Sequence, residues 1–193
     1  MTGQDRQGGV TLAYLRAATR PAHDRLEGTL GLLDEHLDLG AYTQALGRFY
    51  GFWRGWEPRV AALLDDEAFL QPRRRLHLLA ADLAVVGCSP HAVAALPRCP
   101  PPVLRDAAEA FGSVYVMEGS TLGGRIMERN VTRCLGLDQR SGCSYFAGYG
   151  AETGAMWRSF LARLDAMPAV DAPRIAAGAS ATFECLERWL PRR

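Results

Sequence analysis

The chain has 193 residues, 48% of them hydrophobic, and a formal net charge of +1. These values suit one globular domain with a core of its own, and a charge near zero gives no general case for binding nucleic acid or an anionic membrane surface. The five cysteines form no CxxC pair, which argues against a zinc site or a disulfide framework and favours reduced thiols in the cytoplasm.

The first nine residues are polar and glycine-rich and predict a flexible tail, so that a single domain is expected over residues 10–193. The tail lacks the basic and apolar regions of a signal peptide, and no apolar run reaches the ~18 residues that cross a bilayer. Residues 11–27 carry Leu and Ala at helical spacing. We expect Pro21 to interrupt this first helix or to start its second part.

Three further segments follow before the centre of the chain. Residues 41–64 place aromatic and aliphatic side chains at steps of three and four, which predicts a long helix that can bend at Pro58. Residues 73–86 predict another helix, ended by Gly87, and we interpret the arginines at its start, 73–75, as a solvated end. Residues 89–102 predict a loop with one short helical turn at most.

The central segment reads SVYVMEGSTLGGRIMERNV over residues 113–131. It has the apolar spacing of a buried helix ended by Gly136, yet it contains Gly119, Gly123 and Gly124, each of which costs about 1 kcal/mol relative to Ala in a helix interior. One interpretation is close packing against another helix. The other is a backbone surface left open for a flat ligand.

The remaining segments are a glycine-rich connection over residues 138–154 and two helices. We expect Thr153 to cap the first of them and Asp171 to cap the second, with Pro173 in its first turn. No segment alternates as a strand does. The sequence therefore predicts an all-α fold with six to eight helices.

His23 and Glu27 are four residues apart in the first helix, so they share a face. A carboxylate one turn away can accept the Nδ1 proton of an imidazole and leave Nε2 free for a metal. Arg16 lies seven residues before His23, about 10 Å along a helix axis, a spacing that suits a haem with its propionates. The alternative is a structural or solvent-exposed histidine. The other three histidines complete no HxxxH or HExxH pattern.

At this point the chain resembles the haem oxygenase family. The segment LRAATRPAHDRLE over residues 15–27 resembles the proximal helix of that family, and YVMEGSTLGGRIM over residues 115–127 resembles the distal helix in its bacterial form. Residues 145–167 are similar to haem oxygenases that accompany bacterial phytochromes. The resemblance covers most of residues 11–190.

The resemblance implies a single-domain helical fold with haem sandwiched between the two helices. It makes His23 the iron ligand, Glu27 its orienting partner and Arg16 a propionate anchor. The distal face would consist of Gly119, Ser120, Gly123 and Gly124. Tyr115 and Arg158 are implied as further pocket or propionate contacts.

The implied activity is oxidative cleavage of haem, both cofactor and substrate, to biliverdin, carbon monoxide and iron. Molecular oxygen and an external electron donor, a ferredoxin or a reductase, would take part because the sequence carries no flavin or iron–sulfur motif. A bacteriophytochrome would receive the biliverdin; an iron supply is the alternative role. Ser120 stands where mammalian relatives carry an aspartate, so we expect ordered water to assist oxygen activation. A haem-storage protein and a same-fold enzyme of thiamin or quinone-cofactor metabolism stay open.

Overall fold

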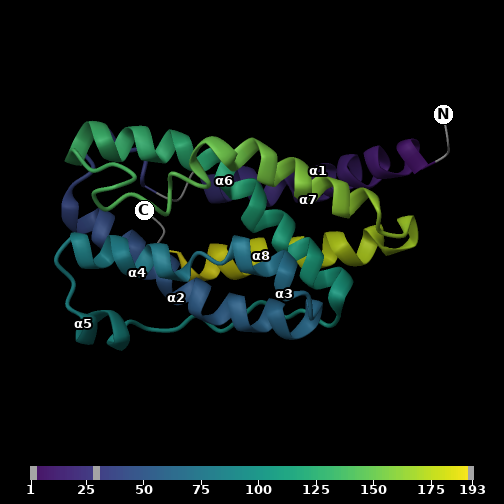
Figure 1. The fold of residues 1–193 in the computed structure, drawn as a ribbon, viewed down its shortest axis with the longest axis horizontal. Coiled ribbons are helices and arrows are strands. Elements are labelled where there is room, and N and C mark those ends of the chain that lie inside the picture. The colour runs from purple at the N-terminus through teal and green to yellow at the C-terminus, as the bar shows by residue number, and fades with distance from the viewer. Residues whose placement is uncertain (1–3, 28–30, 191–193) are drawn as a thin grey trace.

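The computed structural model describes residues 4–27 and 31–190, and in that part every regular element is a helix. The all-α prediction is thus confirmed. The α-helices are α1 (Gln4–Glu27), α2 (Leu39–Leu64), α3 (Glu67–Leu70), α4 (Leu76–Val85), α5 (Pro90–Ala95), α6 (Ala107–Leu135), α7 (Thr153–Asp165) and α8 (Ala172–Trp189). Short 3-10 helices are η1 (Gln71–Arg73), η2 (Gly150–Glu152) and η3 (Ala169–Asp171). Figure 1 shows them arranged lengthwise around α6 and α8.

Helix α1 differs from the prediction at two places. It begins at Gln4, inside the segment expected to be a tail, and it continues through Pro21 without a break. Proline removes one backbone hydrogen bond, but α1 packs along α7 and α8, and the buried Leu15 and Thr19 hold it there. The side chain of Glu27 lies outside the described residues, so its predicted bond to His23 stays a prediction.

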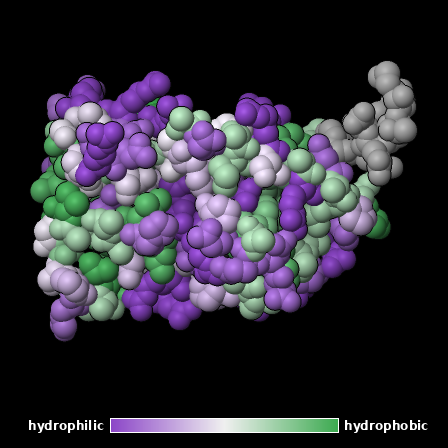
Figure 2. All heavy atoms as spheres, in the orientation of Figure 1, coloured by the Kyte–Doolittle hydropathy of each residue, from purple (hydrophilic) through white to green (hydrophobic). Residues whose placement is uncertain are grey.

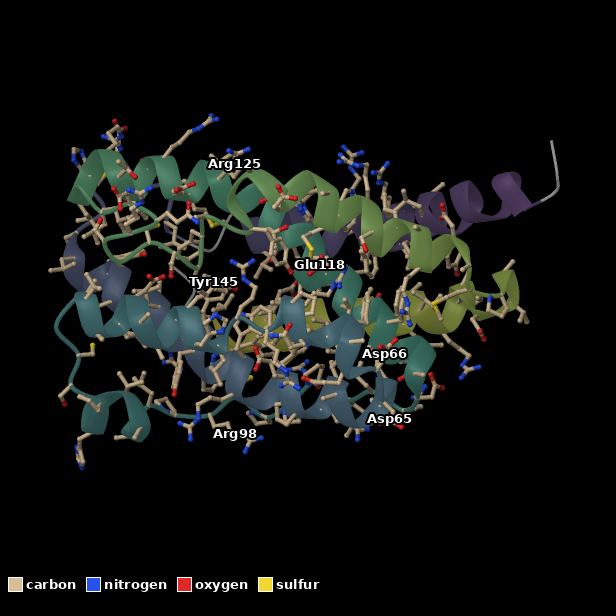
Figure 3. All side chains as sticks on the ribbon, in the orientation of Figure 1. Asp65, Asp66, Arg98, Glu118, Arg125 and Tyr145 are labelled. Atoms are coloured by element: carbon tan, nitrogen blue, oxygen red, sulfur yellow. The ribbon has the colours of Figure 1, made fainter. Side chains whose placement is uncertain are left out.

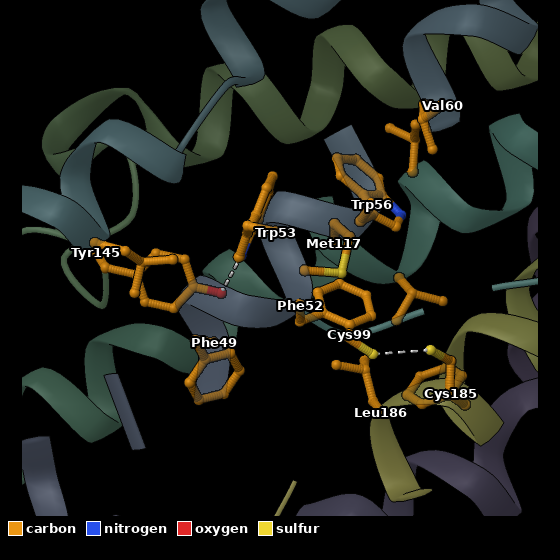
Figure 4. Close-up of a cluster of buried hydrophobic side chains, with 14 of the residues drawn as sticks. Phe49, Phe52, Trp53, Trp56, Val60, Cys99, Met117, Tyr145, Cys185 and Leu186 are labelled. Carbon is orange, nitrogen blue, oxygen red and sulfur yellow. Dashed lines mark hydrogen bonds between the residues drawn. The ribbon is translucent and has the colours of Figure 1, made fainter. Parts of the chain in front are cut away.

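The core forms around the aromatic face of α2, as the spacing predicted (Figure 4). Asp38 caps the helix by accepting the Ala41 N–H at 2.8 Å, and Pro58 lies within it. The ring centroids of Trp53 and Trp56 are 4.8 Å apart, in an edge-to-face pair. Such pairs are favoured by the aromatic quadrupole, so α2 gives the molecule a rigid centre.

Helices α6 and α8 cross with their backbones in contact. A Cβ built on Gly112 would lie 1.7 Å from the Ile175 carbonyl oxygen, and one on Gly178 would lie 1.9 Å from the Glu109 carbonyl oxygen. Only glycine permits such an approach. Beside the crossing, Ser113 and Thr182 share a hydrogen bond of 2.6 Å. These contacts fix the first third of α6 against α8.

Helix α6 is the element that spans the molecule, and Figure 1 shows it changing direction near its middle. Asp106 caps its start by accepting the Glu109 N–H at 3.0 Å. Gly136 ends it in the left-handed region, at φ 68°, as its position predicted. The change of direction falls in the part of the helix that carries the three central glycines, where kinks are expected.

The connection after α6 is held by Asp82 of α4. Its Oδ1 accepts the Ser144 N–H at 2.9 Å, and its Oδ2 accepts the Tyr145 N–H at 2.8 Å. Trp53 then donates its indole N–H to the Tyr145 hydroxyl at 2.9 Å, a bond drawn in Figure 4. Backbone turns within the loop and these bonds from α4 and α2 thus present an aromatic residue at a fixed place.

The two predicted caps after this loop differ in the structure. Thr153 is the first residue of α7, and its hydroxyl donates to Gly150 and accepts from the Tyr149 N–H. It therefore stabilises the preceding turn. Asp171 precedes α8 but caps no N–H with its side chain. Its carboxylate pairs with Arg174 at 3.1 Å instead.

The interpretation of residues 73–75 as a solvated end is wrong for two of the three arginines. Arg73 and Arg75 are only 6% and 2% exposed. The cause is Glu57 of α2, whose Oε1 accepts the N–H of Arg75 at 2.8 Å and that of Leu76 at 3.0 Å. This carboxylate caps α4 and draws the segment onto α2. On the face of the molecule shown in Figure 2, hydrophilic and hydrophobic residues are interspersed.

Candidate functional site

A cavity of about 520 Å³ lies between α1, α6, α7, α8 and the loop that follows α6. This volume falls in the usual range of small-molecule and cofactor sites. Most of its wall is apolar, and most polar residues come from α1 and from the glycine segment of α6. The residues predicted from the sequence that line it are Arg16, His23, Tyr115, Gly119, Ser120, Gly123 and Gly124.

The α1 wall carries the imidazole. The His23 side chain is 54% exposed, and its Nδ1 lies 3.8 Å from Oδ1 of Asp24. Its ring meets the Phe183 ring of α8 edge-on, with centroids 6.2 Å apart. Arg16 and Arg20 lie on the same wall, one turn apart. The Arg20 Nε is 3.9 Å from the Asp24 carboxylate, and both side chains are largely exposed.

The three glycines of the α6 wall have three different surroundings. A Cβ on Gly123 would meet nothing within 4 Å, and one on Gly119 would touch the Trp157 ring at 4.0 Å. A Cβ on Gly124 would lie 2.6 Å from the carbonyl oxygen of Phe146. Gly123 thus leaves open space for a ligand, whereas Gly124 permits close packing. Close packing thus applies at Gly124, but against the loop that carries Phe146 and not against another helix as expected.

Ser120 presents an oxygen to the cavity. Its hydroxyl donates to the Met117 carbonyl oxygen at 2.7 Å, so its single proton is used within the helix. The oxygen can still accept a hydrogen bond from water or a ligand. Thr121 does the same one residue later, donating to the Glu118 carbonyl oxygen at 2.7 Å. These hydroxyls can orient a donor, but they have no second proton to give.

Two more residues were singled out as weaker contacts, and the structure separates them. Tyr115 lines the cavity, with its ring centroid 5.9 Å from that of Trp157. Arg158 is exposed and lies outside the lining. Its neighbour Trp157 is the α7 residue that reaches the cavity. Trp157 and Arg158 differ in this way because consecutive residues point about 100° apart around a helix axis.

The comparison with known families decides the class. A family model described as Heme oxygenase matches residues 11–192. The chain belongs to the haem oxygenase family. A protein named heme oxygenase from Xanthomonas campestris pv. campestris (strain 8004) is 33% identical over 155 residues, covering 77% of this chain and 87% of the relative.

A solved structure, the heme oxygenase from Leptospira interrogans, has the same fold. Its TM-score to this chain is 0.74 at 16% sequence identity, and the match covers 93% of this chain and 98% of the other. The predicted haem-oxygenase-like fold is therefore confirmed. Family membership likewise confirms the predicted function: the chain is an enzyme of haem degradation, with haem as substrate and ligand and with a redox partner.

Several residues of this haem oxygenase cavity were missed in the sequence. Arg20 had a usable signal, since it lies one turn from Arg16. Arg75 had none, because its charge in an arginine run favours solvent. Tyr145 and Phe146 belong to a loop whose position depends on Asp82, more than sixty residues away. The additional lining residues not predicted include Thr19, Phe49, Met127, Phe183 and Leu186.

Two kinds of feature are absent from the described part of the chain. Among residues 4–27 and 31–190, no group of three or more His, Cys, Asp or Glu side chains is placed to hold a metal ion. Within the same part of the chain, no helix is long and apolar enough to cross a membrane. A bare metal ion would need such a group of ligands, whereas an iron inside a macrocycle needs only an axial ligand from the protein.

Proposed function

We propose that this haem oxygenase binds haem between α1 and α6, with His23 as the axial iron ligand. The observation that carries the proposal is one cavity with an imidazole on one wall and open backbone, at Gly123, on the other. The reaction is oxidative cleavage of haem to biliverdin, carbon monoxide and iron. When bound, the haem iron supplies the oxygen and electron chemistry.

His23 is suited to this role by its surroundings. It is the one histidine in the cavity lining, and the edge-on contact with Phe183 limits rotation of its ring. Glu27, one turn along α1, is the proposed partner for Nδ1. That partner would fix the tautomer and leave Nε2 for the metal. The nearby Asp24 carboxylate, 3.8 Å from Nδ1, is a second group able to orient the ring.

Arg16 is the proposed anchor for a propionate, and Arg20, which lines the same cavity, is a second candidate anchor. Both guanidinium groups belong to the α1 wall, and the Asp24 carboxylate offsets part of their charge. A guanidinium binds a carboxylate through two parallel hydrogen bonds. Two such groups on one rim would select the orientation of the ring, and hence the meso carbon that faces the α6 wall. Tyr115 remains a pocket contact, and a propionate role for Arg158 would require its side chain to turn toward the cavity.

The α6 wall excludes bulk and holds water. In this proposal Gly119 and Gly123 keep side chains away from the ring, Gly124 lets α6 pack closely on the loop at Phe146, and the Ser120 oxygen can accept a hydrogen bond from water on this side. Bridging water is nearly as effective as a direct hydrogen bond. The protein therefore contributes binding, orientation and control of water on the distal side.

The wider setting follows the same proposal. Residues 10–193 would act as one domain, with electrons from a ferredoxin or reductase and with biliverdin passed to a bacteriophytochrome. We place the reaction in the cytoplasm, where thiols stay reduced; all five cysteines are free.

A second candidate is a haem-binding protein that does not cleave its ligand. The observation in its favour is the Ser120 hydroxyl, whose proton is used within the helix. The family match to haem oxygenases argues against the thiamin and quinone-cofactor alternatives.

The test is the absorption spectrum after one equivalent of hemin, followed by reductant and air. We expect a Soret band typical of His-ligated haem and then a verdin spectrum. His23→Ala should lose the His-type spectrum, and added imidazole should restore it. An unchanged spectrum in His23→Ala would refute the ligand assignment. A stable haem complex that yields no verdin would favour the second candidate.

A further inference from the structure

A cluster of buried charges lies behind the α6 wall, outside the residues used so far. Glu118 directly precedes Gly119 but is only 3% exposed, and Figure 3 places it in the interior while Arg125 of the same helix lies at the periphery. Its side chain does not line the large cavity. It borders a separate small pocket, partly open to solvent, between α2, η1 and α6.

The contacts of Glu118 are incomplete. The Tyr149 hydroxyl donates to its Oε1 at 2.5 Å. Its Oε2 lies 3.7 Å from Nε of Arg73, beyond hydrogen-bond distance. Oε2 of Glu118 and Nε of Arg73 both lack a hydrogen-bond partner among the described residues. A buried carboxylate oxygen and a buried guanidinium N–H that lie near each other without a hydrogen bond can both be satisfied by one water molecule beside them.

The small pocket next to Glu118 and Arg73 has a volume of about 10 Å³, and Glu57 and Met117 also border it. That is close to the smallest volume that holds one water molecule. The residues that border it carry three unpaired polar atoms, the acceptor Oε2 of Glu118 and the donors Nε and Nη2 of Arg73. Met117 also lines the large cavity, so the small pocket and the cavity share a wall.

Arg75 connects the cluster to the cavity. Its guanidinium carbon lies 5.1 Å from the ring centroids of both Tyr145 and Tyr149, and the residue lines the cavity. Its Nη2 donates to the carbonyl oxygens of Tyr145 and Gly148. The chain of contacts from the cavity therefore runs through Arg75 and Tyr149 to Glu118.

The groups that act on Glu118 are the guanidinium groups of Arg73 and Arg75 and the phenol of Tyr149. The other charged groups nearby have partners of their own: the Glu57 carboxylate accepts N–H bonds at the N-terminus of α4, and Arg74 pairs with Glu67 at 2.6 Å. Burial raises the pKa of Glu118, while the Tyr149 hydrogen bond, Arg73 and Arg75 oppose the rise. A carboxyl of this kind can hold a proton at a pH where exposed carboxyls have lost theirs.

We propose that Glu118 is the proton store of the distal side, acting through Tyr149 and a water molecule held between Glu118 and Arg73. This inference rests on the proposed function, whose oxygen chemistry consumes protons that Ser120 is not placed to give. The carboxyl gives its Oε2 proton to the bound water, that water gives one of its own protons to further water that enters past Met117, and the oxygen chemistry in the cavity consumes it. Arg73 stabilises the carboxylate that remains, and solvent returns the proton. Glu118 is thus a positioning residue that acts at a distance from the haem.

The first test needs no haem. In apo protein labelled with ¹³C at the glutamate carboxyl, the resonance that Glu118→Gln removes should titrate at higher pH than those of exposed glutamates. Tyr149→Phe should move that titration further up, because the hydrogen bond from Tyr149 lowers the pKa of Glu118. A Glu118 resonance that titrates together with the exposed glutamates would overturn the proposal.

The second test uses haem-loaded protein with reductant and oxygen. Glu118→Gln should bind hemin with the wild-type spectrum, yet form verdin on the order of 10²-fold more slowly, with a flattened pH profile. Glu118→Asp should recover part of the rate and of the pH dependence. Glu128→Gln, the same change elsewhere on α6, should match wild type.

The outcomes separate the two proposals. If Glu118→Gln folds poorly, Tyr149→Phe carries the test, since it removes no charge and should still slow verdin formation and shift the pH profile. Wild-type rates and pH profiles in both variants would refute the proton store. Failure of the wild-type protein itself to bind hemin would refute the proposed function, and the apo titration would still report on Glu118.

Discussion

The backbone of Gly124 lies so close to the carbonyl group of Phe146 that a Cβ at position 124 would be 2.6 Å from its oxygen. The neighbouring Gly123 has nothing within 4 Å of the same imagined atom. Two adjacent positions of one helix are therefore occupied by glycine for opposite physical reasons. One lets α6 pack on the loop that carries Tyr145 and Phe146, and the other leaves part of the cavity open.

This pair gives a matched comparison of stability in the haem-free protein. Gly124→Ala should destabilise the fold by about 1–3 kcal/mol, because the loop must move away. Gly123→Ala should be neutral or stabilise it by up to about 1 kcal/mol, because alanine favours the helix. Melting temperatures of the two variants check this, at roughly 2–4 °C per kcal/mol for a chain of this length. Equal losses in both variants would contradict the distinction.

A larger side chain at Gly123 should act on the reaction and leave folding intact. We expect Gly123→Leu to bind hemin through His23 with little change in apo melting temperature, because the space is open. The leucine would occupy the place needed by the ring or by oxygen, and verdin yield in a single turnover should drop. Wild-type turnover in Gly123→Leu would show that this glycine does not face the reacting side.

Reversing the charge of Arg16 should weaken hemin binding by roughly tenfold, about 1.4 kcal/mol, because a carboxylate would then face a propionate. The ring can also rotate in the cavity, which changes the ratio of biliverdin isomers. Hemin titration and chromatography of the isomers measure the two effects. Arg98→Glu makes the same charge change at the periphery (Figure 3) and serves as control. Wild-type affinity and isomer ratio in Arg16→Glu would make Arg16 a surface residue.

The cap at the start of α6 predicts an acid-dependent stability. The Glu109 N–H and Arg174 hold the pKa of Asp106 below its usual value of 3.8. A carboxyl with a lowered pKa stabilises the fold at pH values above its unfolded pKa, and that contribution is lost as the pH falls through the folded pKa. Asp106→Asn keeps the cap without the charge, so unfolding monitored from pH 7 to pH 2 should depend less on pH. Asp106→Ala should cost about 1 kcal/mol at neutral pH.

The buried hydroxyl of Ser113 joins three helices. It accepts the indole N–H of Trp56 at 2.7 Å and shares a bond with Thr182 at 2.6 Å. Ser113→Ala should destabilise the protein by about 1–3 kcal/mol, since a buried donor is left without a partner. Ser120→Ala is the matched control, because that residue is exposed and its hydroxyl donates within its own helix. Chemical denaturation measures both.

The sequence predicted those features of the fold that depend on residues close together in the chain. The spacing along α2 and the position of Gly136 follow from helix periodicity and capping, and His23 and Gly123 could be assigned to one site through a resemblance. The burial of Arg75 could not be predicted, because it depends on Glu57 and on a loop seventy residues away. Thr153 was placed one position wrong for a similar reason: the 3-10 turn before α7 uses its hydroxyl.

The glycine crossing of α6 and α8 has a mechanical consequence. Gly112 and Gly178 bring the two backbones into contact. The first third of α6 is therefore fixed against α8, because no side chains lie between the two helices at the crossing that could rearrange. The rest of α6 is held further along, where Gly124 packs on the carbonyl group of Phe146 and Asn130 donates to the carbonyl oxygens of Leu32 and Asp34. Its least stable helical section is the run from Gly119 to Gly124. Any widening of the cavity to admit a rigid planar molecule is therefore expected to bend α6 at that section and to leave the crossing unchanged.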